Sequence, residues 1–187
     1  MILKSVTFFL KTLNMKKITS ILITIVALLS INISLAQMSK VEIVATGLTC
    51  SMCSNAINKQ LKKLPEVDKV DIDLNSNTFT VTLKKNNNIT PRILKESVQK
   101  AGFFVGSMLV YIDFDNQKII DNSKVKNNNL NLIFIDTNAK ILNGLTKLKI
   151  LDKGYLVTKE FKKNAINYAK YASFSGDNED DYHLKTL

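Results

Sequence analysis

The chain of 187 residues is 45% hydrophobic and 22% charged, which is ordinary for a folded protein and excludes a low-complexity or Pro-rich chain. Lysine and arginine number 26 against 16 acidic residues, a formal net charge of +10, and there are two cysteines and one histidine. With a single histidine, common acid–base catalysis lacks its usual agent, so we expect that the protein is not an enzyme.

Residues 1–36 predict a secretory signal peptide. Two lysines precede the mostly apolar run 18–33, and the segment 34–36 ends in small residues just before Gln37. Met15 fits the start of this pattern better than Met1 does. The alternative is an uncleaved membrane anchor, although the apolar run is shorter than the roughly 20 residues that a spanning helix needs. We therefore expect a periplasmic or secreted protein, cleaved near Ala36.

The positive charge is distributed along the whole chain. Residues 1–36 contain four lysines and no acidic residue, so the remainder carries a formal charge of +6. A basic surface attracts nucleic acid and anionic lipid, but export argues against nucleic acid. We expect contact with a membrane only through the signal segment, if that segment stays uncleaved.

The range 38–110 alternates strand and helix patterns. Val41, Ile43 and Ala45 alternate with polar residues and predict a strand, and the apolar spacing from Ile57 predicts a helix over 51–63. Strands are predicted over 70–74, 79–83 and 103–114, and a second helix is predicted from a Thr90 cap and Pro91 at its first position to Gly102. The order βαββαβ predicts a ferredoxin-like domain.

The rest of the chain has a different character. Residues 111–129 are rich in Lys and Asn and predict a linker, and 130–187 predict a small β-rich domain with one helix. Asn143-Gly144 indicates a two-residue hairpin there, and Thr158 is expected to cap the helix. Phe161, Ala165 and Tyr168 would share its buried face. The overall fold class is α+β.

The two cysteines form one pair, Cys50 and Cys53, where a loop becomes a helix. A disulfide across two residues closes a very small loop and is a poor staple, which favours metal or redox chemistry. The N-terminus of a helix carries partial positive charge, which favours thiolate over thiol. Two thiolates can converge on one soft ion such as Cu(I), whereas a closed zinc site requires four ligands.

The run Gly47-Leu48-Thr49-Cys50-Ser51-Met52-Cys53 resembles the metal loop of heavy-metal-associated domains, as found in copper chaperones, copper P-type ATPases and periplasmic mercury-binding proteins. Leu64-Pro65-Glu66-Val67 and Ala101-Gly102-Phe103 resemble two further segments of that family, and the likeness covers about Ser39 to Met108.

This resemblance implies that Cys50 and Cys53 bind Cu(I), with Hg(II), Zn(II) or Cd(II) as other cargoes. It also implies a metal-donor or metal-acceptor partner such as a copper transporter. Leu48 stands where the family usually has Met, which packs below the site. The expected supporting residues of the loop are Gly47, Leu48, Thr49, Ser51, Met52 and Phe103.

Two other functions remain open from the sequence. The cysteine pair could serve a thiol–disulfide oxidoreductase, or the C-terminal region could dock to an envelope protein while the first domain senses metal. Some side chains that could bind a metal are more simply explained without one. Met52 is expected to be an exposed spacer between the cysteines. His183, beside Asp180 and Asp181, is expected to be a solvated histidine of the tail. Core or surface packing is expected for Tyr155, Tyr168 and Tyr171.

Overall fold

The computed structural model describes residues 37–48, 51–127, 129–175 and 181–187. The predicted signal peptide, Thr49 and Cys50 lie outside the described residues. Residues Leu35–Leu187 form one compact unit. Within the described ranges, no helix is both long enough and apolar enough to span a membrane.

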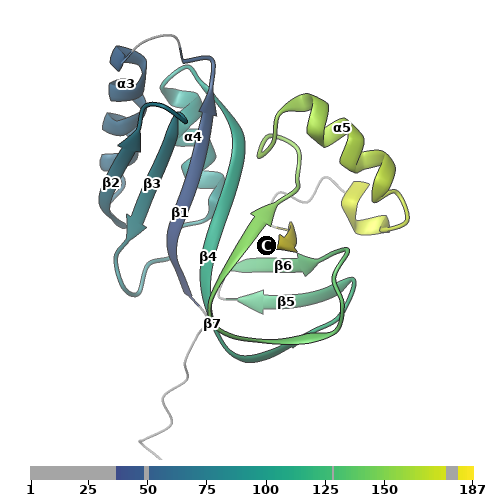
Figure 1. Cartoon of the computed structure of the whole chain (residues 1–187). Coiled ribbons are helices and arrows are strands. Elements are labelled where there is room, and N and C mark those ends of the chain that lie inside the picture. The colour runs from purple at the N-terminus through teal and green to yellow at the C-terminus, as the bar shows by residue number, and fades with distance from the viewer. Residues whose placement is uncertain (1–36, 49–50, 128, 176–180) are drawn as a thin grey trace, which may run out of the picture. The chain divides into compact units, whose positions relative to one another are not determined.

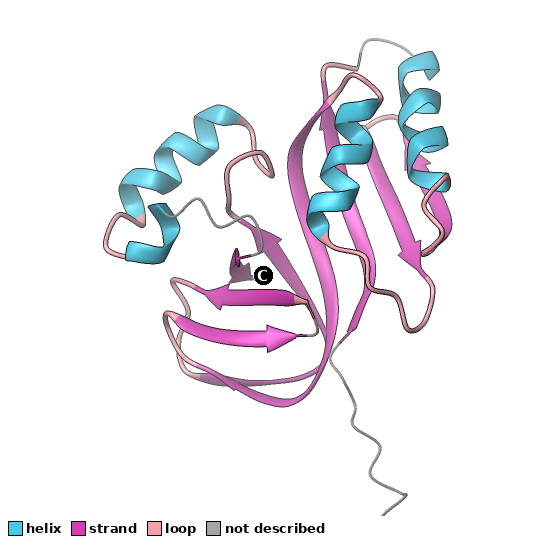
Figure 2. Cartoon of the chain, turned by 180° about the vertical axis from the view of Figure 1, so that it is seen from behind, coloured by secondary structure: helices cyan, strands magenta, loops and turns pink. Residues whose placement is uncertain are grey.

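The first half of this unit has the βαββαβ order that the sequence predicts. The elements are β1 (Gln37–Thr46), α3 (Ser51–Lys62), β2 (Val67–Asp73), β3 (Thr78–Leu83), α4 (Pro91–Lys100) and β4 (Phe104–Ile119). The four strands lie in the order β2-β3-β1-β4 and pair antiparallel. Both helices cover the same face of these strands (Figures 1 and 2). This is the ferredoxin-like arrangement.

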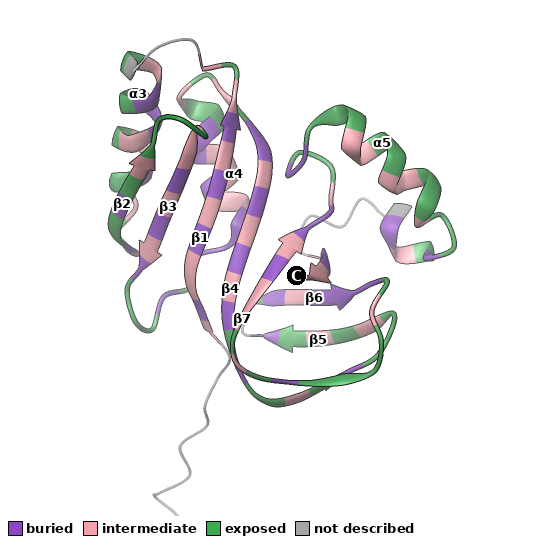
Figure 3. Cartoon of the chain, in the orientation of Figure 1, coloured by how far each residue is buried: buried purple, intermediate pink, exposed green. Residues whose placement is uncertain are grey.

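The sequence patterns explain why these elements form. Along β3 every second residue is buried, and buried and half-buried residues also alternate along β1 (Figure 3). In α3, Ile57 and Leu61 lie one turn apart and are fully buried. The hydroxyl of Thr90 accepts a hydrogen bond from the Ile93 N–H at 3.4 Å, with Pro91 at the first helical position. The predicted cap of α4 is therefore confirmed.

The second half extends the same sheet rather than starting a separate one. Its elements are β5 (Ser123–Asn127), β6 (Leu130–Phe134), β7 (Lys140–Ile150), α5 (Thr158–Asn167), a short 3-10 helix (Ala172–Ser175) and β8 (Asp181–Thr186). The strand order of the eight-stranded sheet is β2-β3-β1-β4-β7-β8-β6-β5. Among the strands that the structure describes, β6 and β8 alone pair in parallel.

The predicted linker over 111–129 is wrong, because most of it is strand. β4 continues to Ile119 and β5 follows after a short turn. Ile112, Phe114 and Ile119 are buried, and the polar residues between them occupy the exposed face. The many Lys and Asn residues of 111–129 therefore belong largely to the solvent-facing positions of β4 and β5 and to the turn between them.

The hairpin predicted at Asn143-Gly144 is also wrong. Gly144 lies inside β7, opposite Phe114 of β4, and has a positive φ of 74°. On β4 the register shifts between Phe114 and Gln117, where Asn116 also has a positive φ, of 48°. The left-handed conformation that Asn and Gly tolerate here serves an irregularity between two paired strands instead of a turn.

Two hydrophobic clusters hold the unit together. The larger one runs without interruption from Met38 in β1 to Leu184 in β8, so both halves share one core. The smaller one is formed by Ile133, Ile135, Leu151, Leu156, Tyr171 and Phe174. Phe161 and Ala165 of α5 and Tyr168, its C-cap residue, pack on it, as their spacing predicts. The predicted cap of this helix is wrong, because Val157 rather than Thr158 is the N-cap and its side chain makes no cap hydrogen bond.

Candidate metal site

The candidate site lies where β1 ends and α3 begins. Gly47 follows β1 with a φ of +88°, and Leu48 is half-buried and packs against the large core cluster. α3 begins at Ser51. The structure thus anchors both flanks of the predicted metal loop and places Leu48 inward.

Cys53 is the third residue of α3 and is half-buried. The first turn of this helix contains no acidic residue, so no neighbouring carboxylate in the turn opposes a thiolate. Met52, directly before it, is 81% exposed, the position expected of a spacer. The geometry of Cys53 therefore suits a thiolate ligand at the tip of a helix.

Phe103 forms a wall beside the loop. A Cβ built on Gly47 would lie 3.8 Å from Cδ1 of Phe103, so the ring lies close to the backbone of the loop. The Phe103 N–H donates to the Val98 carbonyl at 3.2 Å, which ties this residue to the end of α4. An uncharged ring at this place leaves the charge of a bound bis-thiolate complex uncompensated by Phe103 itself.

The chain offers few candidate metal ligands, and the two that the sequence predicts are thiolates, which are soft ligands. Among the residues that the structure describes, no group of three or more His, Cys, Asp or Glu side chains is placed to hold a metal ion. The candidate ligands stay Cys53 and, outside the described residues, Cys50. Two thiolates at this spacing fit an ion that accepts few, polarisable ligands.

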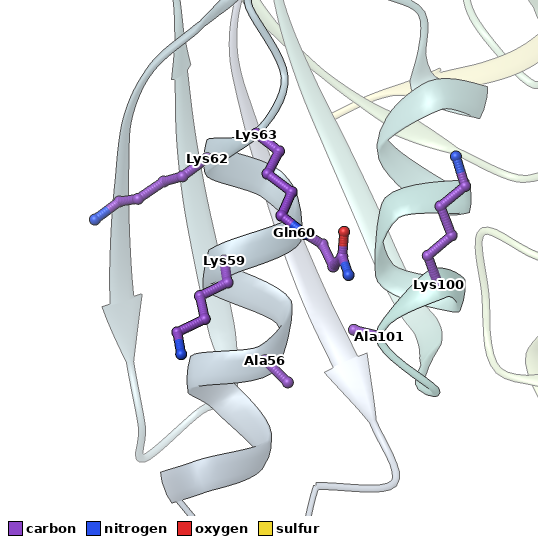
Figure 4. Close-up of a pocket in the computed structure, with 7 residues that line it drawn as sticks. All are labelled: Ala56, Lys59, Gln60, Lys62, Lys63, Lys100 and Ala101. Atoms are coloured by element: carbon purple, nitrogen blue, oxygen red, sulfur yellow. The ribbon is translucent and has the colours of Figure 1, made fainter.

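A basic groove runs between α3 and α4, beginning one helical turn after Cys53 at Ala56. Its volume is about 520 Å³. Gln60 points from α3 toward α4, whereas Lys59 and Lys62 point away from α4 (Figure 4). The groove residues are Ala56, Lys59, Gln60, Lys62, Lys63, Lys100 and Ala101. Ammonium groups do not ligate metals, so the groove contributes positive potential and no ligand.

His183 is not the solvated residue that the sequence predicts. It is only 2% exposed, in β8, and its Nδ1 lies 2.6 Å from Oδ1 of Asp152. The His183 N–H also donates to the other oxygen of Asp152 at 2.7 Å. Among the described residues its Nε2 has no hydrogen-bond partner. The pair joins β8 to the turn after β7, a long-range contact that sequence spacing could not reveal.

The tyrosines are packing residues, as expected. Tyr155 is 4% exposed and lies edge-on to Tyr182 with ring centroids 6.0 Å apart, and this burial raises the pKa of Tyr155 well above its usual range. Tyr171 is equally buried and donates to Asp121 at 2.8 Å. Tyr168 is half-buried against the small core cluster.

The segment around Leu156 and Val157 lies near the site, and no pattern in the sequence predicts this. The segment after β7 returns to the domain, where the Val157 N–H donates to the Gly106 carbonyl at 3.0 Å. Leu156 forms an isolated bridge with Ser107. Gly106 lies two strand positions beyond Phe104, which pairs with Thr46 at the end of β1. A segment of the C-terminal half thus lies beside the strand ends that carry the loop.

Comparison with known proteins finds a match for the first half of the described chain. Residues 43–104 match the family model of the heavy-metal-associated domain. A copper-transporting ATPase of Saccharomyces cerevisiae is 41% identical over 66 residues, which are 35% of this chain but only 6% of the ATPase.

Solved structures also match this region, among them the following two. The yeast copper transporter domain Ccc2a, determined in apo and Cu(I)-loaded states, is 40% identical over 35% of this chain and 88% of its own, with a TM-score of 0.32. The Atx1–Cu(I)–Ccc2a complex matches at 39% identity over 36% of this chain and 90% of the matched chain, with a TM-score of 0.33. This chain therefore contains a heavy-metal-associated domain at residues 43–104.

Proposed function

We propose that this protein is an exported, non-catalytic metal carrier that binds Cu(I) through the thiolates of Cys50 and Cys53. The observation that carries the proposal is the position of Cys53 in the first turn of α3, half-buried and without an acidic residue in that turn. Partial positive charge at a helix N-terminus favours the anionic thiolate. Hg(II), Zn(II) and Cd(II) are further cargoes that thiolates accept.

Release of the ion would proceed by ligand exchange. An incoming thiolate of the partner bonds to Cu(I) as the bond to Cys50 or Cys53 breaks, and a second exchange completes the transfer. Copper stays in its +1 state throughout, so the step needs no oxidant. One matching structure is a complex of Atx1, Cu(I) and Ccc2a, which supports a metal-donor or metal-acceptor protein as the partner.

The cellular location belongs to the same proposal. A signal peptide over 1–36, cleaved near Ala36, would deliver the chain to the periplasm or the exterior. In an oxidising compartment, Cys50 and Cys53 must be reduced before they can bind an ion. The partner would then include whatever keeps this pair reduced.

The decisive experiment is a Cu(I) titration of protein purified fully reduced and without air. The measurement is competition against a coloured Cu(I) chelator for wild type, Cys50→Ser, Cys53→Ser and the double variant. We expect one tightly held Cu(I) per wild-type chain and loss of tight binding in all three variants, because each loses a thiolate that water cannot replace.

Two controls make this result specific. Met52→Leu removes the exposed thioether between the cysteines and is expected to leave the Cu(I) affinity unchanged. Wild-type protein is expected not to reduce insulin disulfides catalytically. Unchanged Cu(I) stoichiometry in the double serine variant would refute the proposal, and turnover with insulin would favour a thiol–disulfide oxidoreductase instead.

A further inference from the structure

Exposed apolar side chains gather at the end of the sheet that carries the metal loop. Met52 in α3 is 81% exposed, and Phe104, at the start of β4, is 66% exposed. Leu74, 56% exposed, lies in the turn after β2, and the neighbouring Asn77 carbonyl of that turn accepts the Ala45 N–H. Of these three, Phe104 also lines a pocket, and exposed apolar surface at a pocket is typical of binding sites.

Next to Phe104 this surface contains a preformed pocket of about 430 Å³. One wall comes from the heavy-metal-associated domain and includes Phe104 and Gln99 of α4. The other wall is the C-terminal segment 153–161, with Leu156, Val157 and Phe161 as its apolar part. The family match ends at residue 104, so this second wall is an addition to the domain.

The C-terminal wall is held in place by several contacts. The backbone of Val157 is bonded to Gly106, and Leu156 is buried with an isolated bridge to Ser107. The ring of Phe161 stacks on Phe174, with centroids 6.1 Å apart and an interplanar angle of 28°. The pocket therefore exists without a ligand to induce it, which lowers the entropic cost of docking.

The charge around the pocket is positive. Lys153 is the charged residue that lines it, and a Cβ built on the lining residue Gly154 would lie 3.9 Å from Nζ of Lys95, so a second ammonium group lies beside the pocket. The nearby acids are already engaged: the carboxylate of Glu160 lies 2.6 Å from Lys149 Nζ, and Asp152 holds His183. A carboxylate beside an apolar side chain therefore complements this pocket.

We propose that this pocket is the docking site for the protein that exchanges metal with this chain, and that it receives an apolar side chain flanked by carboxylates. The inference rests on the proposed function, since docking here would place the partner beside the metal loop. A second copy of this chain is a poor occupant, because the chain without residues 1–36 carries a formal charge of +6 and would meet like charge. The C-terminal half would thus select the partner.

The test is selection of short random peptides displayed on phage against the full, reduced chain, followed by affinity measurement of the selected peptides. We expect enrichment of sequences that combine an acidic residue with a large apolar one. Val157→Asp and Lys153→Glu are each expected to weaken the selected peptides by roughly tenfold or more, because they place negative charge in the pocket. Asp at the N-cap position can bond the first turn of α5, so Val157→Asp should remain folded.

Ile166→Asp is the matched control, because Ile166 is 78% exposed on the same helix and does not line the pocket. Peptide affinity should be unchanged there, and Cu(I) affinity should be unchanged in all three variants. Failure to enrich acidic–apolar peptides, or equal binding to Val157→Asp, would overturn the inference while leaving the Cu(I) titration intact. Pocket-dependent binding to vesicles of phosphatidylcholine and phosphatidylglycerol, without peptide binding, would overturn it in favour of a membrane surface.

Discussion

Gly106 of β4 is hydrogen-bonded to the C-terminal half of the molecule. β1 and β4 change register between Val44 and Ala45, so that Gly106 is an extra residue of β4. Its carbonyl accepts the N–H of Val157 instead. A β-bulge of this kind leaves backbone groups available for a contact outside the ladder, here with the segment that forms the pocket.

We predict that Gly106→Ala destabilises the protein. A Cβ at this position would lie 2.4 Å from Cγ2 of Thr46, too close for two carbon atoms, so Thr46 must rotate. That rotation would disturb the hydrogen bond from the Thr46 hydroxyl to the Phe104 carbonyl, now 3.3 Å long. A loss of about 1–3 kcal/mol is typical of such overpacking, and urea unfolding measures it.

The background variant Thr46→Ser separates this explanation from a general effect of alanine. Serine keeps the hydroxyl but lacks Cγ2, so most of the cost of Gly106→Ala should disappear in the double variant. An equal cost in both backgrounds would show that Thr46 is not the obstacle.

At the scale of elements, three strands are joined by a polar cluster on the sheet face. Glu42 of β1 accepts a hydrogen bond from the Tyr111 hydroxyl of β4 at 2.8 Å, and its second oxygen lies 3.2 Å from Lys147 Nζ of β7. Lys40 lies 3.2 Å from the same carboxylate and 3.8 Å from the Tyr111 ring centroid. Burial opposes ionisation of Glu42, but these bonds outweigh it and hold its pKa below the usual value.

This shift predicts a pH dependence on the acid side. Because the pKa of Glu42 is lower when folded, its contribution to stability is fully present above the unfolded value of about 4.5 and is lost as the pH falls through the folded value. We expect Glu42→Gln to cost about 1 kcal/mol at pH 7, with the difference from wild type vanishing in acid. Urea unfolding at several pH values tests this, with Glu96→Gln on α4 as the charge-matched control; a constant difference at all pH values would argue against it.

Local signals in the sequence were sufficient for the elements of the first domain. The Thr90 cap and the spacing of Ile57 and Leu61 act within a few residues, and they appear as expected. The hairpin predicted at Asn143-Gly144 was wrong because a left-handed conformation occurs both in tight turns and in irregularities within strands. Which of the two forms depends on the pairing with the partner strand, here β4. The prediction of a linker over 111–129 was wrong because β4 and β5 carry many polar residues on one face. These polar residues hide the alternation with the buried apolar residues of the other face.

The candidate site divides in the same way. The resemblance to heavy-metal-associated domains identified the loop and implied that Phe103 lies close to it, although Phe103 and Gly47 are far apart in the sequence. The pocket wall at Val157 and the Asp152–His183 pair depend on contacts between segments that are 31 or more residues apart. No periodicity records such contacts, so they became visible only in the folded chain.

For the molecule as a whole, the shared core predicts one cooperative unfolding transition for residues 37–187. β4 belongs to both halves, and the large cluster extends from β1 to β8. The fragment 130–187 alone is expected not to fold, because β7 loses its partner β4 and β6 loses β5. Because the large cluster takes side chains from both halves, separating them exposes apolar surface that the intact chain buries.

Calorimetry tests this directly, because a two-state unit gives equal calorimetric and van't Hoff enthalpies. Far-ultraviolet dichroism and tyrosine absorbance should then report the same midpoint. The matched fragment 104–187 restores β4 and β5 and should recover strand signal that 130–187 lacks. Two separate transitions, or a folded 130–187 fragment, would mean that the halves are independent domains. In that case the pocket would lie at a movable junction, and the C-terminal half could no longer present a fixed wall to a partner docked at the metal loop.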